Sequence, residues 1–197
     1  MNPQLLLASR SPRRQQLLIQ LGLQVAVHPA DVPELVRQGE APADYAARVA
    51  YEKARAVQQQ TQTPLPVLGA DTDVVLDGKI LGKPTSRAHG VQMLLDLSAR
   101  AHQVVSAVAV VHGARVARAL SVTDVWFAEI SRAQAQSYWD SGEPQDKAGG
   151  YAIQGLGAVF VHKIAGSYSG VVGLPLHETA ALLRGFDLDV LAGAVRA

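Results

Sequence analysis

The sequence predicts a single α/β domain over residues 1–197, with two lobes around a cleft. The first observation is length, because 197 residues suffice for one well-packed core but not for two typical large domains. The second is pattern, because short apolar runs typical of buried strands alternate with segments whose apolar residues recur at helical spacing. The third is composition, since 48% hydrophobic and 18% charged residues exclude a disordered chain.

Charge and composition exclude several classes of function. A formal net charge of +1 gives no overall attraction to nucleic acid or to an anionic membrane, so an anionic substrate needs locally placed cations. No apolar run approaches the length that spans a bilayer, and the chain has no cysteine for disulfides, thiolate nucleophiles or Cys-based zinc sites. Residues 1–4 lack the basic and apolar regions of a signal peptide, which favours a cytoplasmic protein. We therefore expect neither nucleic acid nor a membrane as a partner.

The first sixty residues predict two strands and two helices. Apolar or alternating runs predict the strands, and stripes of leucine or alanine at helical spacing predict the helices. The strands are expected at 5–8 and 23–27, and the helices at 12–21 and 42–60. The irregular segment before the second helix contains a loop acid, Glu34.

An anion site is predicted at the start of the first helix. Ser11 is a favourable N-cap and Pro12 suits the first helical position, which places Arg13 and Arg14 in the first turn. Arginines at this end oppose the helix dipole, so a bound anion explains them better than helix stability does. Backbone N–H groups, the hydroxyls of Ser9 and Ser11 and both guanidinium groups would hold the anion. The alternative is that both arginines are simply solvated.

The second helix carries a charged residue on its apolar stripe. Lys53 lies four residues after Val49 and four before Val57, so its stem is expected to face the core. A lysine on the core side usually has an anionic partner. Here that partner would be the substrate or a carboxylate of the protein.

The segment 67–84 combines carboxylates with a lysine. Residues 67–70 predict a buried strand that delivers Asp71 at its end. The Asp-Gly dipeptide at 77–78 favours a two-residue hairpin turn, which would bring Lys83 back toward Asp71. A carboxylate that binds a metal or activates water, beside a lysine that neutralises a phosphate, suggests metal-assisted attack on phosphorus. The alternative is an ordinary exposed hairpin with acidic turn residues.

The rest of the chain predicts three helices and a long hairpin. Capping residues and apolar spacing indicate the helices, and β-branched and aromatic residues indicate the strands. The helices are expected at 86–97, 131–142 and 176–183, and the strands at 102–112 and 115–130.

The segment 143–175 is rich in glycine without being low in complexity. Its glycines permit close backbone approach, and Gln154 offers an amide donor and an acceptor, which suits the edge of a nucleobase. Neither a Walker-type phosphate loop nor a dinucleotide-binding fingerprint occurs. The six histidines show no metal-ligand spacing. We therefore interpret the histidines as structural or surface residues.

Five short motifs occur in a fixed order and cover nearly the whole chain. They are Ser9 through Arg14, Ala70-Asp71-Thr72, Gly82-Lys83-Pro84, Asp146 through Gly149, and the run from Tyr151 through Gly155 to Gly173-Leu174-Pro175. Together they resemble the motifs of the Maf family of nucleotide pyrophosphatases. The resemblance implies a Maf/ITPase-like α/β fold, with a mixed, twisted sheet flanked by helices. It also implies hydrolysis of nucleoside triphosphates to the monophosphate and pyrophosphate, with Asp71 as the general base.

Three positions resemble the branch of that family that acts on dTTP and UTP. They are Arg13, Thr72 and Gln154. The resemblance thus implies dTTP and UTP as substrates, with CTP and modified pyrimidine nucleotides left open. Four residues depart from the family pattern: Arg10, where a small residue is more usual, Asp73, where an apolar residue is commoner, Ala99, where glycine is usual, and Gly170, where asparagine is frequent.

The expected mechanism uses Mg²⁺ or Mn²⁺ between the triphosphate and protein carboxylates, with Glu34 and Asp71 as the metal ligands. Asp71 would activate the attacking water. Contacts to the phosphates are expected from Arg13, Arg14, Lys53, Lys83, Ser9 and Ser11. A homodimer is implied by the family likeness alone.

The sequence leaves two other functions open. Asp71 and Asp73 have the Asp-x-Asp form of an aspartyl-phosphate phosphatase, which releases orthophosphate through a covalent intermediate. The motif does not closely follow the first strand, and no later acidic pair accompanies it, which argues against that chemistry. The second is a non-catalytic, nucleotide-binding regulator of cell division, since the family is associated with septum formation. Catalysis is favoured by the joint presence of Asp71, Lys53, Lys83 and Glu34.

Overall fold

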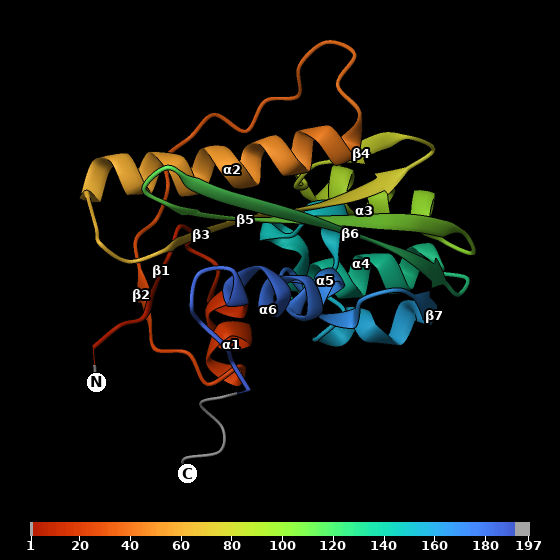
Figure 1. The fold of residues 1–197 in the computed structure, drawn as a ribbon. Helices are drawn as coiled ribbons and strands as arrows, with labels where there is room; N and C mark the ends of the chain where they lie inside the picture. The colour runs from red at the N-terminus through yellow and green to blue at the C-terminus, as the bar shows by residue number, and fades with distance from the viewer. Residues whose placement is uncertain (1, 192–197) are drawn as a thin grey trace.

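The protein, as a computed structural model that describes residues 2–191, forms one mixed sheet flanked by helices (Figure 1). Its seven strands run in the order β2-β1-β3-β5-β6-β7, with β4 paired to β3 off this path. β1 lies parallel to β2 and β3, and the remaining pairs are antiparallel. The strands are β1 Leu5–Leu7, β2 Val25–Val27, β3 Val67–Leu76, β4 Lys79–Leu81, β5 Ala101–His112, β6 Arg115–Phe127 and β7 Val161–Ala165. The α-helices are α1 Pro12–Gln20, α2 Pro42–Thr61, α3 Arg87–Leu97, α4 Arg132–Asp140, α5 Tyr168–Val172 and α6 Leu176–Arg184.

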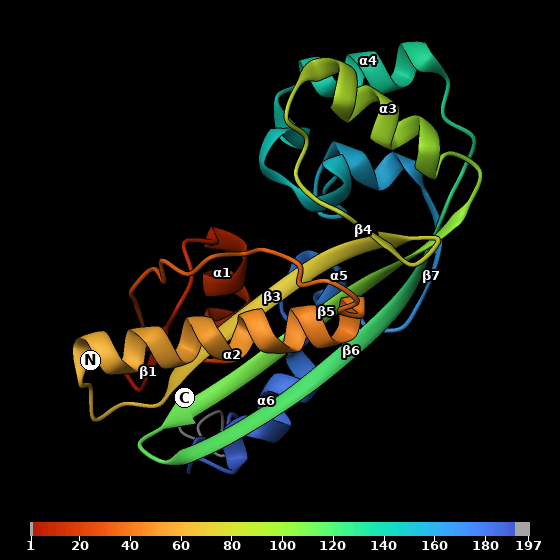
Figure 2. The ribbon, with the colours of Figure 1, turned by 90° about the horizontal axis from the view of Figure 1, so that it is seen from above.

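Helices cover both faces of the sheet, and a second lobe stands beside it. α2 lies along one face over β3 and β5, whereas α1, α5 and α6 lie on the other (Figure 1). α3 and α4 pack on each other and form most of the second lobe, which Figure 2 shows clearly. Because both faces of β3 are covered, all of its residues except Thr72 are buried. The expected α/β fold with two lobes and a mixed sheet is therefore confirmed.

Local signals set the helix boundaries. Ser11 Oγ accepts a hydrogen bond from the backbone N–H of Arg14 at 3.4 Å, and Ser131 forms a reciprocal capping box with Gln134. The predicted helices and the long hairpin agree with the observed elements apart from small shifts at their ends. Within 143–175, where the sequence indicates no regular element, the chain forms β7, α5 and three short 3-10 helices, Glu143–Asp146, Ala148–Gly150 and Leu156–Phe160. No helix between residues 2 and 191 combines the length and the apolar character needed to cross a membrane.

One strand differs from the prediction in a way that shapes the site. The sequence predicts a strand over 67–70 and a separate hairpin arm before Asp77-Gly78, whereas β3 runs without a break from Val67 through Asp71 to Leu76. Acidic residues are depleted in strands, but here Lys53 of α2 pairs with Asp71 and offsets the cost of its burial. Side chains alternate along a strand, so Asp71 and Asp73 point toward α2 and Thr72 points to the opposite face.

The middle of β3 has a free edge. β1 pairs only with the first two residues of β3, and β4 pairs with it from Val74 onward. Residues 69–73 therefore pair with β5 on one side and with no described strand on the other. Because no described strand pairs with this edge, side chains from both faces of β3 can reach the space beside it. Asp71 and Thr72 can thus line one cavity although they point to opposite faces.

The close approach of α2 to β3 depends on Gly69. A Cβ atom added at this position would lie 2.2 Å from the Ala50 carbonyl oxygen and 2.7 Å from the Ala54 nitrogen, both in the backbone of α2. We expect Gly69→Ala to lower the free energy of unfolding by about 1–3 kcal/mol, because the helix must move away from the strand. Urea denaturation checks this, with Gly82→Ala as the control, since a Cβ there meets nothing within 4 Å. Equal stability of the two variants would contradict the prediction.

Candidate active site

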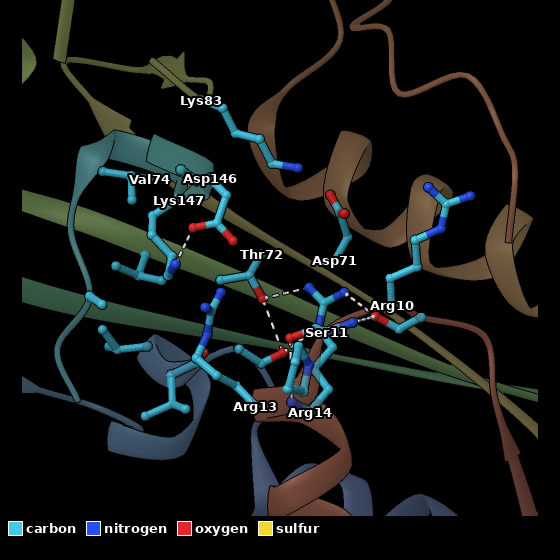
Figure 3. Close-up of a pocket in the computed structure, with 18 of the residues that line it drawn as sticks. Arg10, Ser11, Arg13, Arg14, Asp71, Thr72, Val74, Lys83, Asp146 and Lys147 are labelled. Carbon is cyan, nitrogen blue, oxygen red and sulfur yellow. Dashed lines mark hydrogen bonds and ion pairs between the residues drawn. The ribbon is translucent and has the colours of Figure 1, made fainter. Parts of the chain in front are cut away.

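A cavity of about 420 Å³ opens between the two lobes, beside the free edge of β3 (Figure 3). It is lined by the loop between β1 and α1, the segment after β2, the middle of β3, and the glycine-rich segment. All ten residues that the sequence singles out as site residues line it: Ser9, Ser11, Arg13, Arg14, Glu34, Lys53, Asp71, Thr72, Lys83 and Gln154. The fold therefore brings residues that lie far apart in the sequence, from Ser9 to Gln154, to one place.

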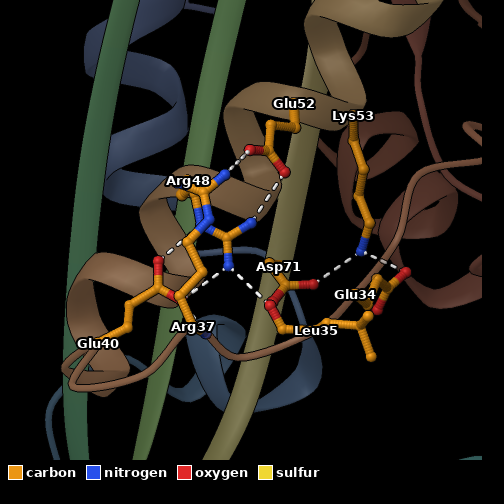
Figure 4. Close-up of polar contacts among 8 residues, drawn as sticks. All are labelled: Glu34, Leu35, Arg37, Glu40, Arg48, Glu52, Lys53 and Asp71. Atoms are coloured by element: carbon orange, nitrogen blue, oxygen red, sulfur yellow. Dashed lines mark hydrogen bonds and ion pairs between the residues drawn. The ribbon is translucent and has the colours of Figure 1, made fainter.

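Lys53 joins two carboxylates in the cavity wall. Its Nζ lies 2.7 Å from Asp71 Oδ1 and 2.9 Å from Glu34 Oε1. Lys53 and Asp71 are buried, whereas Glu34 is partly exposed. Figure 4 shows the three side chains converging from α2, from β3 and from the segment before α2. Lys53 thus faces inward toward anionic partners, as its place on the apolar stripe predicts.

A further carboxylate lies behind Asp71. Asp73 is buried beneath α2 on the same face of β3, and it is not among the residues that line the cavity. Burial raises the pKa of Asp73 to about 8, and the neighbouring Asp71 carboxylate adds to the shift. Burial and the neighbouring carboxylate thus both favour the protonated form of Asp73 beside Asp71.

Asp73→Asn is expected to change how stability depends on pH. The ordinary pKa of this carboxyl is 3.8, and folding raises it. Asp73 therefore stabilises the folded state below that ordinary value and loses this contribution as the pH rises toward 8. Between about pH 5 and pH 8, the metal-free wild type should lose more than about 1 kcal/mol of unfolding free energy relative to the variant, since one pKa unit corresponds to about 1.4 kcal/mol. Urea denaturation across this range checks it, and a constant difference would contradict a protonated Asp73.

The arginines of α1 are tied to the turn before α6. Arg14 Nε donates to the Gly173 carbonyl at 2.8 Å, and its Nη1 and Nη2 donate to Ser9 Oγ and Thr72 Oγ1 at 3.3 Å each. Arg13 Nε donates to the preceding carbonyl of that turn at 3.3 Å. Burial lowers the pKa of the Arg14 guanidinium, and the nearby carboxylates oppose this shift. The alternative that both arginines are simply solvated is wrong. Each guanidinium has five N–H donors, so both retain donors for an anion.

Four further charged residues of the cavity are missed by the sequence analysis as site residues. They are Arg10, Asp31, Asp146 and Lys147. Asp146 and Lys147 pair with each other and lie within one of the five motifs, so a signal for them exists in the sequence. Asp31 lies in an irregular segment that offers no such signal. With them, the lining holds six cationic side chains and four carboxylates, a balance that suits a polyanionic ligand.

Gln154 lies exposed at the cavity rim, on a segment that Glu143 fixes. The Glu143 carboxylate accepts hydrogen bonds from the Tyr138 hydroxyl at 2.6 Å and from the N–H groups of Leu156 and Gly157 at 2.9 and 3.1 Å. The backbone on the C-terminal side of Gln154 is therefore held while its amide stays accessible.

The carboxylates of the cavity fit a metal that arrives with its substrate. Within residues 2–191, no cluster of three or more metal-ligating side chains occurs. Mg²⁺ commonly binds one or two carboxylates and completes its coordination with water and substrate phosphates. Glu34 and Asp71 both bond Lys53 Nζ, so the two carboxylates converge on one cation, the lysine ammonium.

A mixed α/β sheet with a cation-rich cavity and a buried carboxylate between two lobes suits a class of proteins with phosphorylated ligands. Comparison with known proteins narrows this class, because the family model described as "Maf-like protein" matches residues 4–186. The chain belongs to the Maf family.

Named relatives match nearly the whole chain. The "dTTP/UTP pyrophosphatase" of Saccharophagus degradans is 55% identical, covering 94% of this chain and 90% of its own length. Those of Alkalilimnicola ehrlichii and Methylococcus capsulatus are each 50% identical, covering 95% and 96% of both chains. Among solved structures, a dITP/XTP pyrophosphatase from Mycobacterium abscessus matches 64% of this chain and 75% of its own, with 21% identity and a TM-score of 0.43.

Proposed function

We propose that this protein hydrolyses dTTP and UTP to the monophosphate and pyrophosphate, with CTP and modified pyrimidine nucleotides as further candidates. The observation that carries the proposal is that Arg13, Thr72 and Gln154 line one cavity together with Asp71. The relatives named dTTP/UTP pyrophosphatase support the choice of substrate.

In this reaction, water attacks phosphorus, the anhydride bond between the α- and β-phosphates breaks so that the monophosphate and pyrophosphate separate, and Asp71 accepts the proton of the water. Asp71 is suited to this role because it reaches the cavity from β3 and Lys53 fixes its orientation at 2.7 Å. Asp73 is buried behind it and keeps that side of the carboxylate away from solvent.

The triphosphate and the leaving pyrophosphate are held by cations and by the start of α1. Arg13, Lys53 and Lys83 bring positive charge to the cavity, and the first turn of α1 offers the backbone N–H of Arg13 beside Ser11. Ser9 accepts hydrogen bonds from Arg14 Nη1 and from the backbone of Ser11. Ser9 therefore orients the arginine and the loop.

Glu34 and Asp71 would hold Mg²⁺ or Mn²⁺ beside the substrate phosphates. When bound, the metal neutralises phosphate charge and polarises the reacting phosphorus. The partly exposed Glu34 is placed to receive a cation at the cavity mouth, and Lys53 keeps its carboxylate beside Asp71.

Two side chains select the nucleobase: Thr72, whose hydroxyl is held in place, and Gln154, whose amide is accessible. The Thr72 hydroxyl donates to the Gly173 carbonyl at 3.2 Å and accepts from Ser106 Oγ at 3.0 Å and from Arg14, so its position is fixed. The Gln154 amide is exposed and can read the edge of a base. One unmatched buried hydrogen bond discriminates by about 1–3 kcal/mol.

The geometry does not favour the other two functions. An aspartyl-phosphate mechanism needs Asp73 as an acid or base at the reacting group, yet Asp73 is buried beneath α2 and outside the cavity lining. A regulator of septum formation would use the cavity for binding but has no need of a carboxylate held by a buried lysine. From family membership we also propose a cytoplasmic homodimer, which cell fractionation and light scattering test.

The proposal is tested with dTTP, UTP, CTP, GTP and 7-methyl-GTP in the presence of Mg²⁺ or Mn²⁺. We expect pyrophosphate to be released fastest from dTTP and UTP. Faster hydrolysis of GTP or 7-methyl-GTP would contradict the assigned substrates. Nucleotide binding without turnover would instead support the regulator.

A further inference from the structure

Glu34 lies on a segment that no helix or strand holds. Residues 29–41, which we call the strap, run between β2 and α2 without regular structure. Apolar burial does not anchor the two residues that follow Glu34, since Leu35 is 73% and Val36 51% exposed. Nevertheless, Glu34 is placed 2.9 Å from Lys53 Nζ. Another contact must fix the strap.

Arg48 of α2 makes that contact. Its Nε and Nη2 donate to the two carboxylate oxygens of Glu40 at 2.6 and 2.7 Å, and Nη2 also donates to the Leu35 carbonyl at 2.9 Å. Its Nη1 donates to Glu52, on the next turn of α2, at 3.0 Å. The side chains of Arg48 and Glu40 are only 15% and 10% exposed. A bidentate pair that is shielded in this way fixes geometry as well as adding energy.

One helix holds two adjacent residues of the strap. Arg48 binds Leu35 through its carbonyl, and Lys53, five residues further along α2, binds Glu34 through its carboxylate (Figure 4). α2 itself is fixed against β3 by the close contact at Gly69. The position of Glu34 relative to the buried ion pair is therefore set from α2.

We propose that Arg48 is a positioning residue, which clamps Glu40 and Leu35 so that the strap presents Glu34 to the cavity. Arg48 does not line the cavity, so it acts through Glu34 rather than on the substrate. This inference rests on the proposed function, in which Glu34 helps to hold the metal and the phosphates.

Arg37 offers a matched control on the same strap. Its Nη2 bonds Glu52 at 3.2 Å, which ties the strap to the same part of α2. However, its side chain is 66% exposed, and exposed ion pairs contribute little. The two arginines thus differ in shielding and in geometry but not in charge.

The test is a double-mutant cycle between Arg48→Met and Glu34→Ala in the full-length protein. Methionine keeps an apolar stem near the Tyr45 ring and removes all hydrogen-bond donors. We expect Arg48→Met to raise the Mn²⁺ concentration for half-maximal dTTP hydrolysis by about tenfold, with a smaller change in kcat. Arg37→Met should change it by less than about twofold.

The double-mutant cycle distinguishes a positioning role of Arg48 from a general loss of structure or activity. In the Glu34→Ala background, Arg48→Met should add no further effect, because Arg48 acts through Glu34. An equal effect in both backgrounds would overturn the proposal.

Hydrogen exchange of the metal-free protein gives a readout that does not depend on activity. We expect amides of residues 34–40 to exchange about tenfold faster in Arg48→Met, with α2 and β3 unchanged. Unchanged exchange in the strap, or faster exchange throughout α2, would overturn the positioning role. A wild type that does not hydrolyse dTTP would refute the proposed function, and exchange would still decide whether Arg48 holds the strap.

Discussion

Asp71→Asn is expected to lower the turnover of dTTP by about 10²–10⁴-fold, the usual contribution of a general base. Asparagine has nearly the same shape as aspartate, but its amide does not accept a proton from water at neutral pH. Nucleotide binding should be largely retained, because the cations of the cavity are unchanged. Pyrophosphate release at saturating dTTP measures turnover, and titration calorimetry measures binding.

Asp31→Asn provides the matched control. Asp31 also lines the cavity and is exposed, but it has no assigned part in the reaction, so its variant should remain within a few-fold of wild type. Turnover by Asp71→Asn at the wild-type rate would remove Asp71 from the role of base.

Lys53→Gln is expected to reduce both stability and turnover. The substitution leaves the Asp71 carboxylate buried without its cation, and breaking a buried pair in this way costs about 3–5 kcal/mol. It also frees Glu34 from its 2.9 Å contact, so both carboxylates lose their relative position. Turnover should fall by at least about 10²-fold, similar to the loss of one preorganised electrostatic group in other active sites.

Lys79→Gln serves as the control for charge, because Lys79 is exposed on β4 and does not line the cavity. Urea denaturation and pyrophosphate release are measured on both variants. If Lys53→Gln unfolds at the wild-type urea concentration and turns over normally, the ion pair is not essential to the site.

Much of the fold follows from signals that are local in the sequence. Ser11 and the Ser131–Gln134 pair cap their helices by contacts within four residues, so the sequence alone locates these ends. The turn at Asp77-Gly78 has φ of 50° and 74°, the backbone conformation that this dipeptide favours. Such features do not depend on the rest of the chain.

The parts that sequence reasoning missed depend on distant contacts. β3 continues through Asp71 because Lys53, on another element, pairs with its carboxylate. Among the described strands, β7 pairs with the C-terminal end of β6 alone, and its largely exposed residues give no clear pattern of burial. Neither contact leaves a local signature in the sequence.

In the candidate site, too, some features follow from local sequence and others depend on distant contacts. The orientation of Lys53 follows from helical spacing, whereas the choice of Thr72 and Gln154 depends on motifs shared with a family. Arg48 looks like an ordinary partner for Glu52 at (i, i+4), and its more informative partner, Glu40, lies on an irregular segment. Only the folded chain brings Arg48 and Glu40 together.

The most direct test of the role of Asp71 is a single turnover of dTTP in H₂¹⁸O, with protein in excess and Mg²⁺ present. Direct attack by water predicts dTMP and pyrophosphate as products, with one ¹⁸O atom in them after the first turnover and none in Asp71. Release of orthophosphate, or a covalent phosphate or nucleotide adduct on Asp71 trapped by acid quench during the turnover, would contradict the proposed mechanism, and the adduct would indicate a covalent aspartyl intermediate.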